Sequence, residues 1–198
     1  LATAARAFYR EAAERAILTG ITGTNGKTTT AWLIDAVLRA TGERTALIGT
    51  VNYRIGDTLL PAANTTPESL DIYELIQRLS DLGGRYLTME VSSHALALGR
   101  VHGVHYQTAV FTNLTQDHLD FHRTMDAYFG AKGLLFSPER AQPPTWAVLN
   151  ADDPYANHVA LAPQTEAIRF GLNQTADLRA LNVETGFQGI SFDVEWQG

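Results

Sequence analysis

The chain has 198 residues, of which 45% are hydrophobic and 18% charged, the proportions of a folded globular protein rather than a disordered one. Its formal net charge of −6 argues against a general grip on nucleic acid or on an anionic membrane surface. The absence of cysteine excludes disulfides, thiolate zinc sites, iron–sulfur clusters and a cysteine nucleophile. Because no apolar run is long enough for a membrane span and no signal peptide opens the sequence, we expect a cytoplasmic protein.

Apolar runs alternate with helical patterns along the chain. In chain order we expect a helix over 2–16 and a strand over 17–22. The next helix has an apolar stripe at Leu33, Ile34, Val37 and Leu38 and stops at Gly42, and it is followed by a strand over 46–48 and a helix from Thr66 and Pro67 to Gly83. The remaining elements are strands over 86–91 and 109–111, a helix near 124–136, a strand near 146–149, a helix near 153–161 and a strand near 168–170. Strands separated by helices predict an α/β fold with a mostly parallel, doubly wound sheet and helices on both faces. The segment 178–196 predicts a small antiparallel hairpin at the end.

The first predicted strand is followed by GTNGKTTT at 23–30, in the strand-to-helix context of a phosphate-binding loop, or P-loop. Glycine lets backbone N–H groups close around phosphate oxygens, and the N-terminus of the following helix adds a favourable dipole. Lys27 would reach the β- and γ-phosphates, and the Thr28 hydroxyl would ligate Mg²⁺. The usual spacing has a glycine where this chain has Ile21, so the alternative is a glycine-rich turn with an exposed lysine. The strand–turn–helix context favours phosphate binding.

Acidic residues and histidines follow two later strands. Glu90 ends one of them and is placed to meet the metal of a bound nucleotide, because ligands of open α/β sheets bind beyond the carboxyl ends of strands. His118 and His122 follow another strand and would share one face if that stretch is helical. The Glu of a zinc-protease helix is absent, so we favour His118 as a ligand or orienter for magnesium. For Glu90 the alternative is a solvated carboxylate at a strand end. For the stretch with His118 and His122 the alternative is a capping loop with solvated His and Asp side chains.

Lys132 falls on an apolar helix stripe with Met125, Phe129 and Phe136, at spacings of 4, 3 and 4 residues. A lysine in that position either snorkels to the surface or, shielded by Phe and Met, loses its proton easily. A neutral amine can react with carbon dioxide to give a carbamate. Such a carbamate would turn the cation into a carboxylate-like metal ligand near His118.

In their order and spacing, these motifs resemble the central ATPase domain of the Mur ligases, the ATP-dependent amide-forming enzymes of peptidoglycan assembly. The resemblance runs from about Ala16 to the C-terminus. It is carried by GTNGKTTT (23–30), MEVSSHALALGRV (89–101), TNLTQDHLDFH (112–122), AYFGAKGLLF (127–136) and LNADDPYA (149–156). Within the family, NTTPE (64–68) and EVSSHAL point to members that add the third peptide residue, a diamino acid, to UDP-N-acetylmuramoyl-L-alanyl-D-glutamate (UDP-MurNAc-L-Ala-D-Glu).

The resemblance implies roles for the matching positions. The implied catalytic residues are Lys27, Glu90, His118 and Lys132, and the implied ligands of two Mg²⁺ ions are Thr28, Glu90, His118 and a carbamylated Lys132. ATP would be held by Gly23, Thr24, Asn25, Gly26, Lys27, Thr28 and Thr29, with Asn150 near the adenine. The muramoyl dipeptide would contact Asn64, Thr65, Thr66, Ser92 and Arg100, and Leu98 stands where some members have a glutamine.

The implied reaction has two steps. The γ-phosphate of ATP passes to a D-glutamyl carboxylate, and the amine of the incoming diamino acid then attacks the acyl phosphate. Because the family also has an N-terminal domain for the uridine nucleotide and a C-terminal domain that selects the amino acid, we expect 16–198 to be the central domain and 1–15 a linker helix. We expect the isolated chain to bind nucleotide weakly and to turn over poorly.

Three alternatives stay open. Another ligase of the same superfamily, such as a folylpolyglutamate synthase, is disfavoured by NTTPE and by Ser92-Ser93-His94. A P-loop GTPase or kinase would usually place an aspartate, often within DxxG, where this chain has Glu90. The third alternative is a nucleotide-binding module without catalysis of its own.

Overall fold

The structure, a computed structural model, describes residues 2–187 and 189–197. Within that part of the chain, the strands form one sheet in the order β10-β9-β8-β7-β6-β1-β5-β2-β3-β4. The strands are β1 (Ile17–Thr22), β2 (Thr45–Ile48), β3 (Asn52–Ile55), β4 (Thr58–Pro61), β5 (Tyr86–Glu90), β6 (Thr108–Phe111), β7 (Trp146–Asn150), β8 (Glu166–Gly171), β9 (Leu178–Gly186) and β10 (Gly189–Trp196). The helices are α1 (Ala2–Phe8), α2 (Arg10–Arg15), α3 (Lys27–Ala40), α4 (Ser69–Asp81), α5 (Ser93–Ala97), α6 (Leu119–His122), α7 (Met125–Gly133) and the 3₁₀ helix η1 (Pro154–His158).

The middle of the sheet is parallel, which confirms the predicted α/β fold. β1 lies between β5 and β6, with Ile21 opposite Glu90 on one side and Val110 on the other. β2 continues the parallel order beyond β5, and β7 and β8 continue it beyond β6. The carboxyl ends of these strands therefore share one edge of the sheet, and the P-loop that follows β1 lies at its centre.

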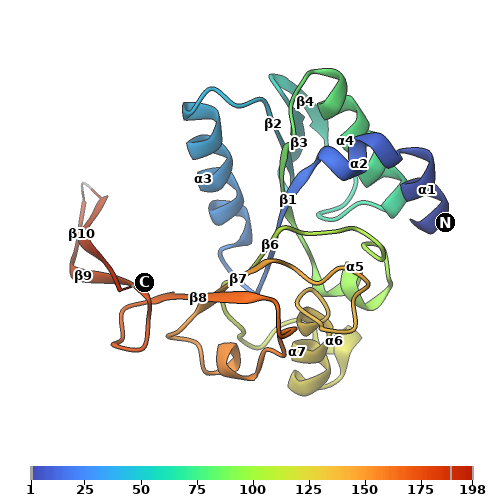
Figure 1. Cartoon of the computed structure of the whole chain (residues 1–198). Helices are drawn as coiled ribbons and strands as arrows, with labels where there is room; N and C mark the ends of the chain where they lie inside the picture. The colour runs from blue at the N-terminus through green and yellow to red at the C-terminus, as the bar shows by residue number, and fades with distance from the viewer. Residues whose placement is uncertain (1, 188, 198) are drawn as a thin grey trace.

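Antiparallel strands complete both ends of the sheet. β3 and β4, which the sequence did not predict, form a hairpin against β2. The predicted C-terminal hairpin is confirmed as β9 and β10, and it joins the main sheet through a short parallel pairing of β9 with β8. Figure 1 shows this hairpin projecting away from the body of the molecule.

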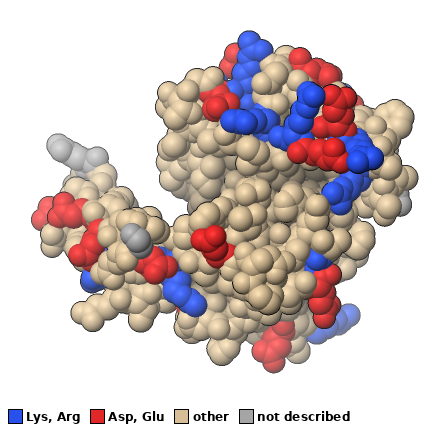
Figure 2. All heavy atoms as spheres, viewed as in Figure 1, with Lys and Arg blue, Asp and Glu red and all other residues tan. Residues whose placement is uncertain are grey.

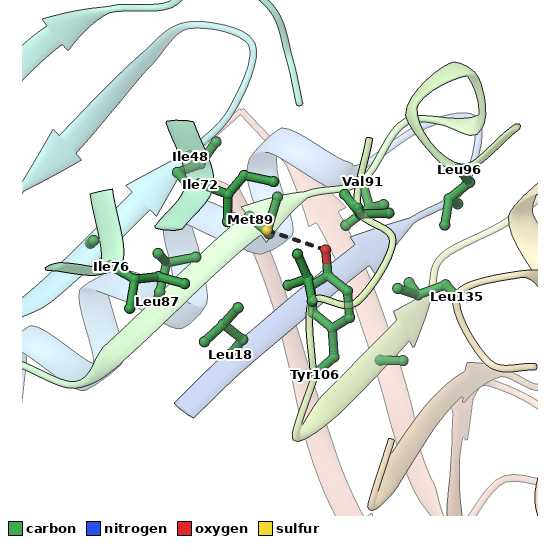
Figure 3. Packing of buried hydrophobic residues seen from close by; sticks show 14 of the residues in the cluster. Leu18, Ile48, Ile72, Ile76, Leu87, Met89, Val91, Leu96, Tyr106 and Leu135 are labelled. Atoms are coloured by element: carbon green, nitrogen blue, oxygen red, sulfur yellow. Dashed lines mark hydrogen bonds between the residues drawn. The ribbon is translucent and has the colours of Figure 1, made fainter. Parts of the chain in front are cut away.

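The two faces of the sheet are covered unequally. Figure 1 shows α3 on one side, whereas α1, α2 and α4 lie on the other. The larger core lies beneath the latter group, where Ile72 and Ile76 of α4 pack with Leu87 and Met89 of β5, and Tyr106 donates its hydroxyl to Sδ of Met89 at 3.4 Å (Figure 3). None of the described helices combines the length and apolarity needed to cross a bilayer.

The predicted apolar stripe of α3 is confirmed in part. Ile34 and Leu38 are partly buried, and Ile34 packs on the smaller core cluster, whereas Leu33 and Val37 are 62% and 65% exposed. The fully buried positions of the helix are Ala31 and Asp35. Asp35 forms an ion pair with the buried guanidinium of Arg54 on β3, a partner that apolar spacing does not indicate.

Other differences are local. The helix expected from Thr66 begins at Ser69, because the Thr66 hydroxyl donates to the backbone O of Glu90 and accepts from the backbone N of Ser92 instead of capping a helix. The segment 2–16 divides at Tyr9 into α1 and α2. The helix expected over 153–161 is the shorter 3₁₀ helix η1, and α5 and α6 were not predicted.

Charged side chains of both signs are intermixed on the face shown in Figure 2. They are densest at the upper right of the view, over the part of the molecule where Figure 1 places α1, α2 and α4, and they also occur on the projecting hairpin.

Candidate active site

The loop after β1 has the geometry that phosphate binding requires. Gly26 is the N-cap of α3 with a φ of 84°, a left-handed conformation that glycine adopts without strain. Lys27 begins the helix, and its Nζ donates to the backbone oxygens of Gly23 and Thr24, each at 2.9 Å. Burial lowers the pKa of Lys27, although the charge of Glu90 opposes that shift. Lys27 is thus folded over its own loop and is not the exposed lysine of a generic turn.

A second segment clamps the P-loop from the side. Thr112 donates its hydroxyl to the backbone O of Asn25 at 2.7 Å, and Asn25 N donates to Oδ1 of Asn113 at 3.0 Å. Thr24 N donates to the backbone O of Asn113, and Thr115 N donates to Oγ1 of Thr24. The sequence analysis missed this function of the TNLT motif, because the pairing of β6 with β1 brings together residues about ninety positions apart.

Glu90 is buried beside the P-loop, only 1% exposed, which rules out the solvated carboxylate. Its Oε2 accepts from the Thr28 hydroxyl at 2.9 Å and from the Thr50 hydroxyl at 3.2 Å, and its Oε1 accepts from Thr50 N at 2.9 Å. No arginine or lysine of the described segments forms an ion pair with it at 4.0 Å or less. A buried carboxylate held by hydroxyls and an amide, next to a threonine hydroxyl, suits a hard cation such as Mg²⁺.

The histidines form a ring cluster rather than one helix face. His118 is the N-cap of α6 in a left-handed conformation with φ 51°, so it stands outside the helix that carries His122. The His94 ring lies between the two, with centroids 4.9 Å from His118 and 5.4 Å from His122. His122 is buried against the Ser93 hydroxyl at 2.9 Å, and burial lowers its pKa.

His118 is the most exposed histidine of this cluster, with a side chain that is 47% exposed, and is therefore the one most accessible to a ligand. Across residues 2–187 and 189–197, no three His, Asp or Glu side chains are arranged to hold a metal by themselves. A metal at this edge would therefore need further ligands, which the phosphate oxygens of a nucleotide would supply.

Lys132 does not snorkel: it is 1% exposed. Its Nζ donates to the backbone O of Gly23 at 2.8 Å, the same oxygen that Lys27 contacts, and it lies 4.4 Å from the ring centroid of Tyr128. Burial, followed by the positive charge of Lys27, lowers the pKa of Lys132 to about 7. A large fraction of the amine is therefore neutral near neutral pH.

Tyr128 is a site residue that the sequence analysis missed. It lies one helical turn before Lys132, and its hydroxyl is 3.3 Å from Oγ1 of Thr24 in the P-loop. Its ring also packs against His122 at 5.1 Å between centroids. The i, i+4 spacing to Lys132 was the signal that could have identified it.

Most residues expected to contact an acceptor gather near the end of β5. Asn64 is exposed, Thr65 is half-buried, and Thr66 is buried with its hydroxyl engaged within the protein. Ser92 caps α5 by accepting from Ala95 N at 3.2 Å. The described structure thus leaves the side chains of Asn64 and Thr65 more accessible than that of Thr66.

Arg100 and Asn150 are held by their neighbours. Arg100 forms an ion pair with Glu68 at 2.9 Å. Asn150 donates to the backbone O of Thr112 at 2.7 Å and accepts from Asp152 N at 3.0 Å. Asn150 thereby links the ends of β7 and β6, two strands from the P-loop strand.

Comparison with known proteins gives consistent matches. A family model of the Mur ligase middle domain matches residues 21–198. UDP-N-acetylmuramoyl-L-alanyl-D-glutamate–2,6-diaminopimelate ligase of Solibacter usitatus is 54% identical over 197 residues, 100% of this chain and 40% of the relative. The ligase of the same name from Geobacillus kaustophilus is 48% identical, over 97% of this chain and 40% of the relative. The chain thus spans about two fifths of the length of these curated relatives.

Solved structures agree in fold. A structure of UDP-N-acetylmuramoyl-L-alanyl-D-glutamate–2,6-diaminopimelate ligase matches with a TM-score of 0.82 at 31% identity, over 92% of this chain and 37% of that one. A Mycobacterium tuberculosis folylpolyglutamate synthase matches with a TM-score of 0.73 at 17% identity, over 100% of this chain and 51% of that one. At that identity the second match shows a shared fold alone.

Proposed function

The chain belongs to the Mur ligase family, and from this premise we propose that residues 16–198 are the ATP-binding central domain of a ligase that adds a diamino acid to UDP-MurNAc-L-Ala-D-Glu. The observation that carries the proposal is the convergence of Thr28, Glu90 and Lys132 on one P-loop. Residues 1–15 would lead into this domain. The remaining length of the relatives would supply the parts that grip the uridine nucleotide and select the incoming amino acid.

Mur ligases are ATP-dependent and generally use Mg²⁺. In this chain, residues 23–29 would hold the phosphates through backbone N–H groups and Lys27, with Asn150 toward the adenine. Thr28 and Glu90 would hold one Mg²⁺, and His118 with a carbamylated Lys132 would hold a second. When bound, these ions neutralise charge on the phosphate oxygens.

The environment of Lys132 supports carbamylation. Its pKa of about 7 leaves a neutral amine whose lone pair can attack the carbon of carbon dioxide. A C–N bond forms, one C–O π pair moves onto oxygen, and the nitrogen loses a proton to solvent. The product is an anionic carbamate beside Lys27, where the like-charge repulsion between two ammonium groups becomes attraction.

The proposed reaction uses the chain mainly for positioning and electrostatics. Lys27 would lie against the transferring γ-phosphoryl group as the bond to the ADP oxygen breaks and the bond to the D-glutamyl carboxylate forms. The diamino-acid amine then attacks the acyl carbon and releases one proton to solvent, and phosphate leaves with the electron pair of the broken C–O bond. Asn64, Thr65, Thr66, Ser92 and Arg100 would orient the acceptor at the end of β5.

Magnesium-dependent ATP binding tests the proposal. We expect calorimetry on the 198-residue chain to show saturable binding of ATP with Mg²⁺ that Lys27→Ala abolishes. Arg78→Ala, an exposed cation on α4, is the matched control and should bind like the wild type. Equal binding by wild type and Lys27→Ala would contradict a P-loop function.

Two further comparisons separate the alternatives. Preference for ATP over GTP would disfavour a GTPase. Product identification with a longer chain of the same protein, offered UDP-MurNAc-L-Ala-D-Glu or a folate acceptor, would distinguish a Mur ligase from a folylpolyglutamate synthase.

A further inference from the structure

The loop after β2 holds the carboxylate of Glu90 at both oxygens. The backbone N of Thr50 donates to Oε1 at 2.9 Å, and the Thr50 hydroxyl donates to Oε2 at 3.2 Å. Thr28 contributes the only other side-chain donor among the described residues, to Oε2 at 2.9 Å. Among the described residues, Thr50 is therefore the one that donates hydrogen bonds to both oxygens, which restrains the plane of the carboxylate.

Gly49 makes this contact possible. A Cβ atom at position 49 would overlap Oε1 of Glu90, so the loop approaches the carboxylate as closely as backbone alone allows. Any larger residue would have to displace either the loop or the Glu90 side chain. The dipeptide Gly49-Thr50 thus forms a cradle for one carboxylate.

A purely structural explanation accounts poorly for this cradle. Glu90 is 1% exposed, and burying a carboxylate without a cationic partner is costly. A fold that needed only packing at the end of β5 would be served by an apolar residue. Hydroxyl and amide donors instead orient the carboxylate through hydrogen bonds, while no Lys or Arg of the described segments forms an ion pair with it.

We propose that Thr50 is a positioning residue that orients the Glu90 carboxylate toward the magnesium ion of bound ATP. The inference rests on the proposed function, since Glu90 is expected to serve the metal. Thr50 acts through Glu90 and not through a contact of its own with the nucleotide.

The same hydroxyl reaches the acceptor side of the site. Oγ1 of Thr50 lies 3.1 Å from Oγ1 of Thr65, a half-buried residue of the NTTPE loop. A chain of contacts therefore runs from Thr65 through Thr50 and Glu90 to Thr28 of the P-loop. Thr50 is placed to link the loop expected to meet the acceptor with the carboxylate expected to meet the metal.

The test measures how ATP affinity of the 198-residue chain depends on Mg²⁺ concentration, by calorimetry, with thermal unfolding recorded in parallel. Thr50→Val keeps the shape of the side chain and removes the hydroxyl. We therefore expect the Mg²⁺ concentration that gives half of the maximal increase in ATP affinity to rise about tenfold, as for the loss of one hydrogen bond to a charged group. ATP binding without metal should stay as in the wild type, and the unfolding midpoint should fall only slightly, by the usual cost of one lost hydrogen bond. Thr50→Ser should restore the wild-type Mg²⁺ dependence to within about threefold, since it keeps the donor.

Two more variants sharpen the result. Thr58→Val, an exposed position on β4, is the matched control and should leave the Mg²⁺ dependence unchanged. Gly49→Ala should shift it in the same direction as Thr50→Val, because the added methyl group displaces the carboxylate that Thr50 orients.

The outcomes are distinguishable. A Thr50→Val chain with the Mg²⁺ dependence of the wild type overturns the inference and leaves the proposed function intact. So does a Thr50→Val chain that loses stability and metal-free binding alike and is not rescued by Thr50→Ser, since that pattern describes a structural role. A wild-type chain without any magnesium-dependent ATP binding overturns the proposed function, and this inference with it.

Discussion

Arg54 and Lys132 are the two cationic side chains buried within the described residues, 5% and 1% exposed, and the protein treats them differently. Arg54 forms an ion pair with the buried Asp35, and it also donates to the backbone O of Gly56 at 2.6 Å. Asp35 accepts a further hydrogen bond from Thr45 at 2.6 Å. The pair lies between β3 and α3 and is satisfied on all sides by the protein.

Lys132 has no such partner: no carboxylate of the described segments lies within 4.0 Å of its Nζ. Its surroundings are one backbone oxygen, the face of Tyr128 and the like charge of Lys27, and its pKa falls to about 7. Arg54 is thus a buried charge whose loss of hydration is offset by a partner, whereas the charge of Lys132 is not offset. An unpaired buried group with a strongly shifted pKa is characteristic of functional sites.

The largest expected effect on stability is at the ion pair of Asp35 with Arg54. Asp35→Ala should lower the free energy of unfolding by about 3–5 kcal/mol, because it leaves Arg54 buried and unpaired. The double variant Asp35→Leu with Arg54→Met should recover most of that loss, since apolar residues of similar size replace both charges. Urea denaturation of the three proteins checks this, and a double variant as unstable as the single one would show that the pair is not the cause.

Lys132→Met should lower turnover and leave stability intact, the opposite of Asp35→Ala, which is expected to act on stability. We expect ligase turnover of a longer chain carrying the substitution to fall by about 10²–10³-fold, the usual effect of removing one group that stabilises developing charge. Stability of the 198-residue chain should not decrease, because the uncompensated amine is replaced by an apolar side chain of similar length. Retained turnover, or a loss of stability comparable to that of Asp35→Ala, would make Lys132 a structural residue.

The pH dependence of stability follows from the lowered pKa of Lys132. Unfolded lysine keeps its proton up to a pKa of 10.5, whereas the folded amine releases it near 7, so the unfolded state binds more protons between these values. The free energy of unfolding therefore rises with pH across this range. Below pH 7 the amine is protonated in both states, so the full cost of burying its charge lowers the stability. Between pH 7 and 9 the wild type should gain about 2 kcal/mol relative to Lys132→Met.

That gain is measured by denaturation in buffers freed of carbon dioxide, so that the amine stays unmodified. Because Lys132→Met has the same other titrating groups, the difference between the two proteins isolates the contribution of Lys132. Parallel stability curves for the two proteins would contradict a lowered pKa at position 132.

The smallest effect concerns the hydroxyl of Tyr128. Tyr128→Phe removes the contact with Thr24 and keeps the ring against Lys132, so we expect a loss of about 1 kcal/mol in unfolding free energy. The pH dependence should stay as in the wild type, since the environment of the amine is preserved. Thermal unfolding at pH 7 and 9 measures both quantities, and a changed pH dependence would assign the hydroxyl a role in tuning Lys132.

The amino-acid sequence by itself determined the alternation of strands and helices, the P-loop after the first strand and the placement of Lys132 on the apolar stripe of its helix, while the structure decided that the amine is buried. These features depend on periodicity, on glycine in tight turns and on residues a few positions apart, which act within one element. The parallel order of the middle strands then follows from the βαβ alternation. For these reasons the fold class and the residues around Lys27 were predictable.

Tertiary structure alone decided the partners of those residues. Asp35 is buried against Arg54 of β3, and Glu90 accepts hydrogen bonds from Thr50 because β2 lies next to β5. The β3–β4 hairpin and the clamp from Thr112 likewise depend on which strands become neighbours. Such contacts join positions far apart in the chain, and local propensity carries no information about them until the strand order is known.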